Sequence, residues 1–249
     1  MTTSMIITTY DRAELLRYSL ASIARQPVPD LEILIINDYR QDETEAVVNS
    51  FKDQLDISYH FTGHRNKDAV IWRCPGFAIN YGVKRCKGDY IIISCAEIYH
   101  LDDVLHKMIA STGGLVVLYG YDDKGQVLQD LRQNITPTVD SVHEYRDNSK
   151  VTGLNTLLPF CMGMLKDDFI YIGGYDEDFT GQAYDDNDLV TRLQDLGLSY
   201  IKVDASIIHL YHSRKLATRS LERIAHNRSL FERRKGVIVR NTDKEWGLG

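Results

Sequence analysis

The sequence lacks a membrane-spanning run and has few residues that interrupt regular structure. Its longest apolar stretches, such as 91–93 and 115–119, are far shorter than the roughly 20 residues that a transmembrane helix needs. The residues after Met1 show neither a basic leader nor an apolar stretch of signal-peptide length. Only 5 prolines and 17 glycines occur among 249 residues, which excludes collagenous and low-complexity classes. We therefore expect a globular protein of the cytoplasm.

Cysteine pairs and a basic excess are also missing. The four cysteines, Cys74, Cys86, Cys95 and Cys161, form no CxxC motif and no zinc-type spacing with histidines. This disfavours a disulfide framework and a structural zinc site. The 29 Lys and Arg are outnumbered by 35 Asp and Glu, so no nucleic-acid partner is expected. The exception is the segment 214–240, where nine basic residues meet two glutamates.

The hydrophobic pattern is typical of parallel strands joined by crossover helices. Expected strands cover residues 4–9, 31–36, 57–61, 90–93 and 200–203. Expected helices cover residues 14–25, 42–51, 76–84, 101–111, 186–196 and 216–234. Between residues 113 and 155, turn signals at 122–125 and 136–137 predict hairpins and loops. These features indicate an α/β fold.

Polar residues follow the expected strands at the edge where open parallel sheets bind their ligands. They are residues 8–12 after the first strand, 37–38 after the second and 94–97 after the fourth. None of these turns contains GxGxxG or GxxxxGK[ST], which argues against a dehydrogenase of the Rossmann type and a P-loop NTPase.

Four motifs, in order, resemble those of the family 2 glycosyltransferases, nucleotide-sugar enzymes with the GT-A fold. Residues 6–12 look like the family's strand and T-Y-N-R turn, and residues 31–38 are similar to its E-I-I-V-V-D-D. Arg73 and the stretch 80–91 resemble its R, N-x-G and G-D-Y-I elements. Residues 172–197 look like G-G-F-D-E-x-F followed by E-D-x-D-L-x-x-R-L-x-x-x-G. The resemblance runs over most of the chain.

This resemblance implies a single GT-A domain over residues 1–212, with a mostly parallel central sheet flanked by helices. Residues 1–112 would form the nucleotide-binding half, residues 113–212 the acceptor-binding half, and residues 213–249 a basic helical extension. It further implies that a sugar moves, with inversion, from a nucleotide-diphosphate sugar to a hydroxyl of a glycan or lipid-linked acceptor. UDP is the commonest nucleotide in the family, with GDP and dTDP as alternatives.

The motifs assign a nucleotide site. Carried over by position, it comprises Thr8, Tyr10, Arg12, Asp38 and Arg73, with Arg73 near the diphosphate. The assignment is chemically sound, because a carboxylate accepts a hydrogen bond from a pyrimidine imide and an aromatic ring offers a stacking face. The alternatives are a half-buried core tyrosine at position 10 and a simple turn or helix-cap residue at position 38.

A carboxylate must take the proton of the acceptor hydroxyl, which is a weak nucleophile. Alignment with the family's E-D pair makes Asp186 this base and Asp185 a contact to a sugar. Alternatively these acids only complement a helix dipole, as we expect for Asp188. A catalytically silent nucleotide-sugar or glycan-binding module remains a second hypothesis, but it leaves the Asp185–Asp186 pair unexplained.

The metal motif departs from the family. Where D-x-D is usual, the chain has Cys95-Ala96-Glu97, so a single acid remains. We expect Glu97 and His212, with diphosphate oxygens, to hold Mn²⁺ or Mg²⁺. Alternatively His209 and His212 are ordinary loop histidines. If no metal binds, Arg214 and Lys215 would supply positive charge to the diphosphate directly.

The basic helix expected over 216–234 carries one apolar stripe, formed by Ala217, Leu221, Ile224 and Phe231. The stripe predicts docking onto the domain with the arginines in solvent. The alternative is peripheral contact with the inner face of a membrane, which would suit a lipid-linked acceptor.

Overall fold

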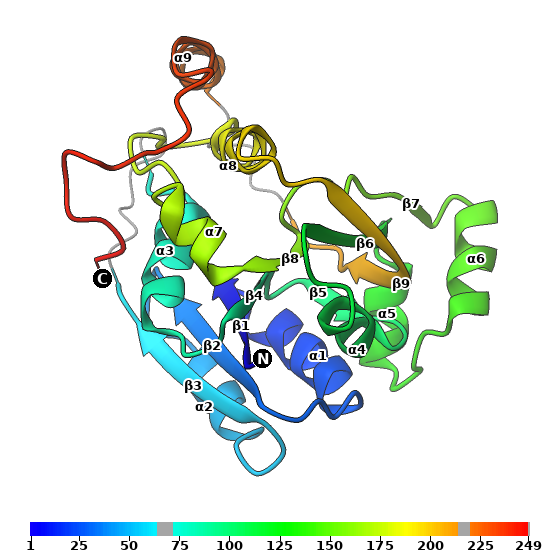
Figure 1. Cartoon of the computed structure of the whole chain (residues 1–249). Coiled ribbons are helices and arrows are strands. Elements are labelled where there is room, and N and C mark those ends of the chain that lie inside the picture. The colour runs from blue at the N-terminus through cyan, green and yellow to red at the C-terminus, as the bar shows by residue number, and fades with distance from the viewer. Residues whose placement is uncertain (64–71, 214–219, 249) are drawn as a thin grey trace.

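The structure is a computed structural model that describes residues 1–63, 72–213 and 220–248. The described residues form one mixed sheet with helices on both faces (Figure 1). Its strands are β1 (Thr3–Thr9), β2 (Leu31–Asn37), β3 (Asp56–Phe61), β4 (Tyr90–Cys95), β5 (Ile98–His100), β6 (Leu115–Asp123), β7 (Val151–Gly153), β8 (Cys161–Leu165) and β9 (Tyr200–His209). The helices are α1 (Ala13–Ala24), α2 (Thr44–Asn49), α3 (Pro75–Arg85), α4 (Val104–Ile109), α5 (Gln126–Arg132), α6 (Val139–Asp147), α7 (Lys166–Tyr171), α8 (Asp185–Asp195) and α9 (Leu221–Arg233).

The first four strands of the sheet order, β3-β2-β1-β4, are parallel. Successive residues of β1 point to opposite faces, so Met5 and Ile7 pack with α1 while Ile6 packs with α3. Both faces of these strands are therefore covered, which explains their nearly continuous apolar sequences. The register pairs Thr8 with Ile36 on one side and with Cys95 on the other, so the three strand ends lie at one edge.

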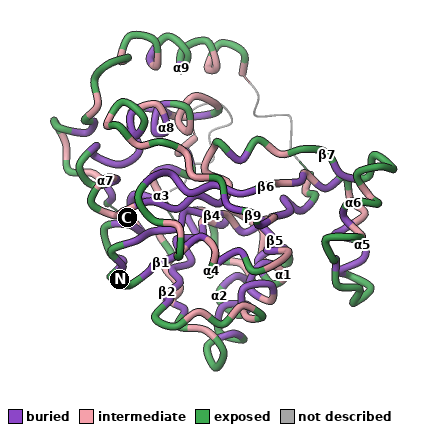
Figure 2. The backbone as a smooth tube through the Cα atoms, turned by 45° about the vertical axis from the view of Figure 1, so that its right-hand side comes forward, coloured by how far each residue is buried: buried purple, intermediate pink, exposed green. Residues whose placement is uncertain are grey.

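The second half of the sheet continues as β8-β6-β9-β5. Strand β8 is antiparallel to β4 and to β6, while β9 is parallel to β6 and antiparallel to β5. Gly163 of β8 lies where a Cβ atom would come 1.9 Å from the hydroxyl of Tyr90, so this position requires glycine. Strands β1, β2 and β4 are buried along almost their whole length, whereas the first half of β9 has exposed and half-buried residues (Figure 2).

The prediction of hairpins and loops over residues 113–155 is wrong. This stretch contains the nine-residue strand β6, helices α5 and α6, and the short strand β7. The apolar run at 115–119 is buried strand, and α5 buries Val127, Leu128 and Leu131 at helical spacing. The sequence analysis also omits β5, β8 and α7, and it ends β9 six residues early.

Helix α9 lies beyond α8 at the edge of the molecule, with its outer side exposed (Figures 1 and 2). The prediction that it docks through an apolar stripe with its arginines in solvent is only partly right. Leu221 is 77% exposed, whereas Asn227 and Leu230 are buried. Arg223 donates to Thr180, so it faces inward. Ala217 lies outside the described residues.

The C-terminal segment, residues 234–248, returns from α9 to the body of the molecule. The backbone N–H of Arg240 donates to Ile172 O at 3.0 Å. The Lys84 ammonium lies 4.0 Å from the centroid of the Trp246 ring. This segment therefore joins α9 to the region around α7 and α3.

Candidate active site

A cavity of about 540 Å³ opens where β1 and β4 end. We call it the cleft. Its lining comes from residues 8–12, 94–97, 158–160 and 181–187, with Trp72 and Tyr175. Ligand binding at the carboxyl ends of parallel strands is the general rule for such sheets. The cleft thus contains the predicted residues Thr8, Tyr10, Arg12, Glu97, Asp185 and Asp186.

At one side of the cleft, aromatic and charged groups from β1, β2 and the start of α3 come together. The rings of Tyr10 and Tyr39 lie 4.2 Å apart between centroids, at 33°. Asp38 is buried, accepts a hydrogen bond from the Thr62 hydroxyl, and forms an ion pair with Arg73 at 3.5 Å. Sequence reasoning missed Tyr39, although it directly follows Asp38.

Arg12 lies in the cleft and has two side-chain partners there. Its Nε lies 3.1 Å from Glu97 Oε1, and its Nη2 donates to His212 Nδ1 at 3.1 Å. One guanidinium therefore bridges the two residues that the sequence predicts as metal ligands. Beside them, His209 Nδ1 lies 2.9 Å from Asp122 Oδ1.

The donor set around Arg12 suits a hard divalent cation. A carboxylate oxygen and an imidazole nitrogen already converge on one positive charge, and burial lowers the pKa of His212, which favours the neutral ligand form. Within residues 1–63, 72–213 and 220–248, however, no group of three or more His, Cys, Asp or Glu side chains is placed to hold a metal. A cation would therefore need ligand oxygens from the substrate and displacement of Arg12. The alternative diphosphate contacts, Arg214 and Lys215, lie outside the described residues.

Asp185 and Asp186 begin α8, line the cleft and are both half-buried. The buried Tyr175 hydroxyl donates to Asp186 Oδ1 at 2.9 Å. Burial, with the neighbouring Asp186 carboxyl, raises the pKa of Asp185 to about 8. Burial also raises the pKa of Asp186, and the Tyr175 hydrogen bond opposes this shift. Two adjacent acids whose pKa values are both raised are suited to proton transfer.

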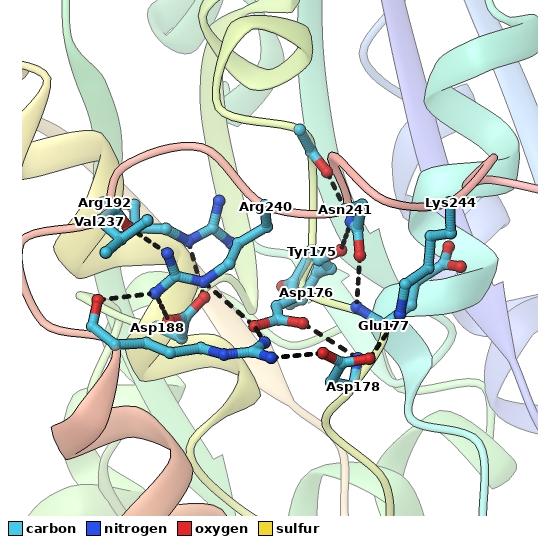
Figure 3. A network of polar contacts seen from close by, with 12 residues as sticks. Tyr175, Asp176, Glu177, Asp178, Asp188, Arg192, Val237, Arg240, Asn241 and Lys244 are labelled. Carbon is cyan, nitrogen blue, oxygen red and sulfur yellow. Dashed lines mark hydrogen bonds and ion pairs between the residues drawn. The ribbon is translucent and has the colours of Figure 1, made fainter.

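Asp188, one helical turn further along, has a structural role beyond the helix dipole that we expected for it. It is buried and pairs with Arg192 at 2.7 Å and with Arg240 at 2.8 Å (Figure 3). Arg192 also donates to the carbonyl oxygens of Ile172 and Gly174 at 2.9 and 2.8 Å.

The same network continues into the C-terminal segment (Figure 3). Arg240 pairs with Asp176 at 3.1 Å, and Arg234 pairs with Asp176 and Asp178. Lys244 also pairs with Asp178. These contacts fix the base of α8, and hence the cleft wall, to the end of the chain that the structure describes.

Comparison with known proteins places this fold and cleft in a family. The sequence model of glycosyl transferase family 2 matches residues 4–173, more than half of the chain, so the chain belongs to that family. A second model, described as the N-terminal domain of galactosyltransferase, matches residues 142–215. The family and fold class expected from the sequence are thereby confirmed.

Relatives and solved structures agree with this assignment. Validoxylamine A glucosyltransferase of Streptomyces hygroscopicus subsp. jinggangensis is 27% identical over 230 residues, covering 78% of this chain and 52% of the relative. An uncharacterised glycosyltransferase of Rickettsia typhi is 30% identical over 106 residues, covering 42% of this chain and 30% of the relative. The chain thus spans about half or less of these relatives.

Two solved structures share the fold at low identity. TarS from S. aureus has a TM-score of 0.64 at 16% identity, covering 94% of this chain and 39% of TarS. The mannosyltransferase PcManGT from Pyrobaculum calidifontis, in complex with GDP-Man and Mn²⁺, has a TM-score of 0.56 at 16% identity, covering 86% and 58%. In the described ranges of this chain, every helix is too short or too polar to cross a bilayer.

Proposed function

We propose that the protein is an inverting glycosyltransferase that moves a sugar from a nucleotide-diphosphate sugar to an acceptor hydroxyl. The observation that carries this proposal is the arrangement of the cleft. Two carboxyl groups with raised pKa line the same cleft as the polar and aromatic residues at the end of β1, where the ring of Tyr10 lies beside that of Tyr39. Family membership supports the same reaction class.

In this mechanism Asp186 takes the proton of the acceptor hydroxyl as that oxygen attacks the anomeric carbon. The hydrogen bond from Tyr175 holds one carboxylate oxygen, which orients the carboxylate and leaves the other oxygen for the proton. Asp185 contacts a sugar hydroxyl. The nucleotide diphosphate leaves from the opposite face of the sugar, so the configuration inverts.

We assign the nucleotide to Thr8, Tyr10, Asp38 and Arg73, with Tyr39 as an added aromatic contact. A uracil base fits this set, because its imide N–H can donate to the Asp38 carboxylate, as can the same group of thymine. The TarS structures include complexes with UDP and with UDP-GlcNAc, which favours a UDP-sugar, whereas PcManGT was solved with GDP-Man.

A divalent cation, Mn²⁺ or Mg²⁺, would be held by Glu97 and His212 together with oxygens of the diphosphate. When bound, it would neutralise charge on the leaving group. Arg12 lies between the two ligands in the free protein and would move to the diphosphate or to solvent.

We assign the acceptor, a glycan or lipid-linked sugar, to the half formed by residues 113–212. The nucleotide half is residues 1–112, and residues 213–249 form the basic extension. Contact of α9 with an inner membrane face would place the cleft near a lipid-linked acceptor.

The test is a two-part measurement on wild type and Asp186→Asn. A thermal-shift panel of UDP, GDP and dTDP with Mn²⁺ identifies the base, since binding to the native state raises stability. Transfer and donor hydrolysis are then measured with the matching sugar nucleotides. We expect Asp186→Asn to bind nucleotide like wild type and to lose about 10²–10⁴-fold in turnover.

Asp195→Asn, at the exposed far end of the same helix, is the control and should behave like wild type. The reduced metal motif favours a second candidate, a silent nucleotide-sugar binding module. Wild type that binds nucleotide but neither transfers nor hydrolyses any donor would establish that alternative. Unchanged turnover in Asp186→Asn would remove this residue from the mechanism.

A further inference from the structure

The loop directly before the two candidate catalytic acids has an unusual backbone. Ala183 and Tyr184 have φ values of 76° and 72°, and Gly181 has a φ of 73°. Residues other than glycine rarely adopt this left-handed region, so Ala183 and Tyr184 are held there by their surroundings. The direction in which Asp185 and Asp186 enter the cleft depends on these angles, because the two acids follow Tyr184 immediately.

One side chain of α9 donates hydrogen bonds to the backbone carbonyls of this loop. Asn227 is fully buried, and its amide nitrogen lies 3.0 Å from the carbonyl oxygen of Thr180 and 3.1 Å from those of Gln182 and Ala183. Two N–H groups are thus shared among three carbonyls of one short loop. The contact spans 44 to 47 residues of sequence, so local structure does not create it.

Neighbouring contacts support the loop from both sides. On the α9 side, Arg223 Nε donates to Thr180 O at 2.8 Å, and the Phe231 ring lies 5.7 Å from the ring of Tyr184. On the other side, the N–H of Gly181 donates to Trp72 O at 2.7 Å. The loop is therefore clamped between α9 and the residues that precede α3.

Packing alone does not account for asparagine at position 227. Asparagine is a poor helix former, and burying an amide costs free energy unless it is bonded. Its Oδ1 is buried and has no hydrogen-bond partner among the described residues, so the hydrogen bonds of the side chain are those donated by its nitrogen. An apolar residue would fill the same space but would leave three loop carbonyls without this donor.

We propose that Asn227 is a positioning residue that holds residues 180–183 so that Asp185 and Asp186 face the cleft. The proposal rests on the glycosyl transfer assigned above. It gives α9 a function within the reaction, because the helix supplies the donor that fixes the loop before the base.

The test compares Asn227→Ala and the milder Asn227→Ser with wild type. We expect turnover to fall about 10–100-fold, since small misplacements of a catalytic group have effects of that size. The affinity for UDP with Mn²⁺ should fall less than turnover does. Arg73 forms a β-bridge with Thr180 of this loop, but its side chain is held by Asp38, which the variants leave in place. Hydrogen exchange of the amides of residues 181–186 should accelerate.

Gln26→Ala is the matched control. Gln26 also bridges two backbone groups, Ser22 O and the N–H of Leu105, but outside the cleft. It should lower the melting temperature without lowering turnover. If it lowers turnover as much as Asn227→Ser does, for the same loss of melting temperature, the Asn227 effect is general destabilisation and the proposal is wrong.

Hydrogen exchange of the loop amides distinguishes a failure of this proposal from a failure of the proposed function. Unchanged exchange at residues 181–186 in both Asn227 variants overturns the positioning role, whatever the activity. A wild type inactive with every donor overturns glycosyl transfer, while faster loop exchange in the variants would still show that Asn227 holds the loop.

Discussion

Asp185 illustrates how an acid proposed for the active site lowers stability. Its pKa is raised from 3.8 to about 8, so the folded protein disfavours the charged form. The stability that a protonated Asp185 contributes is fully present below pH 4 and is lost as the pH rises towards 8. The same carboxyl pair that suits the reaction therefore destabilises the fold near neutral pH.

We accordingly predict that Asp185→Asn is more thermally stable than wild type at pH 8 and gains little at pH 4. The asparagine cannot ionise, so it avoids the cost of a buried charge beside Asp186. Melting temperatures measured from pH 4 to pH 8 test this, with Asp195→Asn as the control. A difference between variant and wild type that does not grow with pH would contradict it.

Asp38 is the residue on which the nucleotide assignment depends most. We predict that Asp38→Ala weakens UDP binding by about 1.5–3 kcal/mol, the usual range for a hydrogen bond to a charged group. Calorimetry is the measurement, and Glu45→Ala, an exposed acid on α2, is the control. Equal affinity in Asp38→Ala and wild type would reduce Asp38 to the partner of Arg73.

Glu97 and His212 give a third prediction at this scale. If both hold one cation, Glu97→Ala and His212→Ala each abolish stimulation by Mn²⁺, and the double variant loses little more than either single one. Nucleotide affinity with and without Mn²⁺ is measured for all four proteins. Full turnover of wild type in excess chelator would instead favour Arg12 and Arg73 as the charges near the diphosphate.

At the scale of elements, α9 has two unlike faces. Its inner face uses Arg223 and Asn227 to hold the loop before α8, whereas Arg228 and Arg233 lie on the exposed side. Among the basic residues of this region that the structure describes, Arg223, Arg234 and Arg240 bond to the protein itself. Arg228, Arg233 and Lys235 are exposed.

We predict that membrane contact through α9 is weak and salt-sensitive. Each basic residue near an anionic surface contributes about 1 kcal/mol, so Arg228→Gln with Arg233→Gln should abolish binding to phosphatidylserine vesicles at low salt. Sedimentation with vesicles is the measurement, and turnover on a water-soluble acceptor should not change. Equal sedimentation of variant and wild type would exclude α9 as the contact.

The elements also show what the sequence can and cannot predict. Strands β1, β2 and β4 were predictable because burial on both faces produces continuous apolar runs. Strands β5 and β8, of three and five residues, are too short to show a period. Motif resemblance located Asp38, Glu97 and Asp186, which follow strands or begin a helix.

Other site residues depend on contacts that no local pattern reveals. Tyr175 lies 11 residues before Asp186, and Asn227 lies more than 40 residues after the loop it bonds. Arg12 pairs with Glu97 and His212, at separations of 85 and 200 residues. Hydrogen bonds between residues so far apart in the sequence can be identified only once the fold is known.

At the scale of the whole molecule, the buried charges join distant parts of the chain. Arg240 is 5% exposed and pairs with both Asp176 and Asp188. We predict that Arg240→Ala lowers the free energy of unfolding by about 3–5 kcal/mol, because buried carboxylates lose a partner. Denaturant unfolding measures this, and Lys235→Ala, which is exposed, is the control. A loss below about 1 kcal/mol would mean that Arg192 and Arg234 alone are enough to compensate the charges of Asp188 and Asp176.

The order of the strands has a consequence for how the chain folds as it is synthesised. When β4 has been synthesised, its neighbour β1 is already present, but its other neighbour, β8, follows some 65 residues later in the chain. Strand β5 likewise precedes its partner β9 by about 100 residues. Until then the nascent protein presents the open, apolar edge of β4, which is a template for pairing with other chains. Slow closure by such distant partners is expected from the high contact order of the topology. Aggregation during synthesis, rather than instability of the finished protein, is then the hazard built into this sheet.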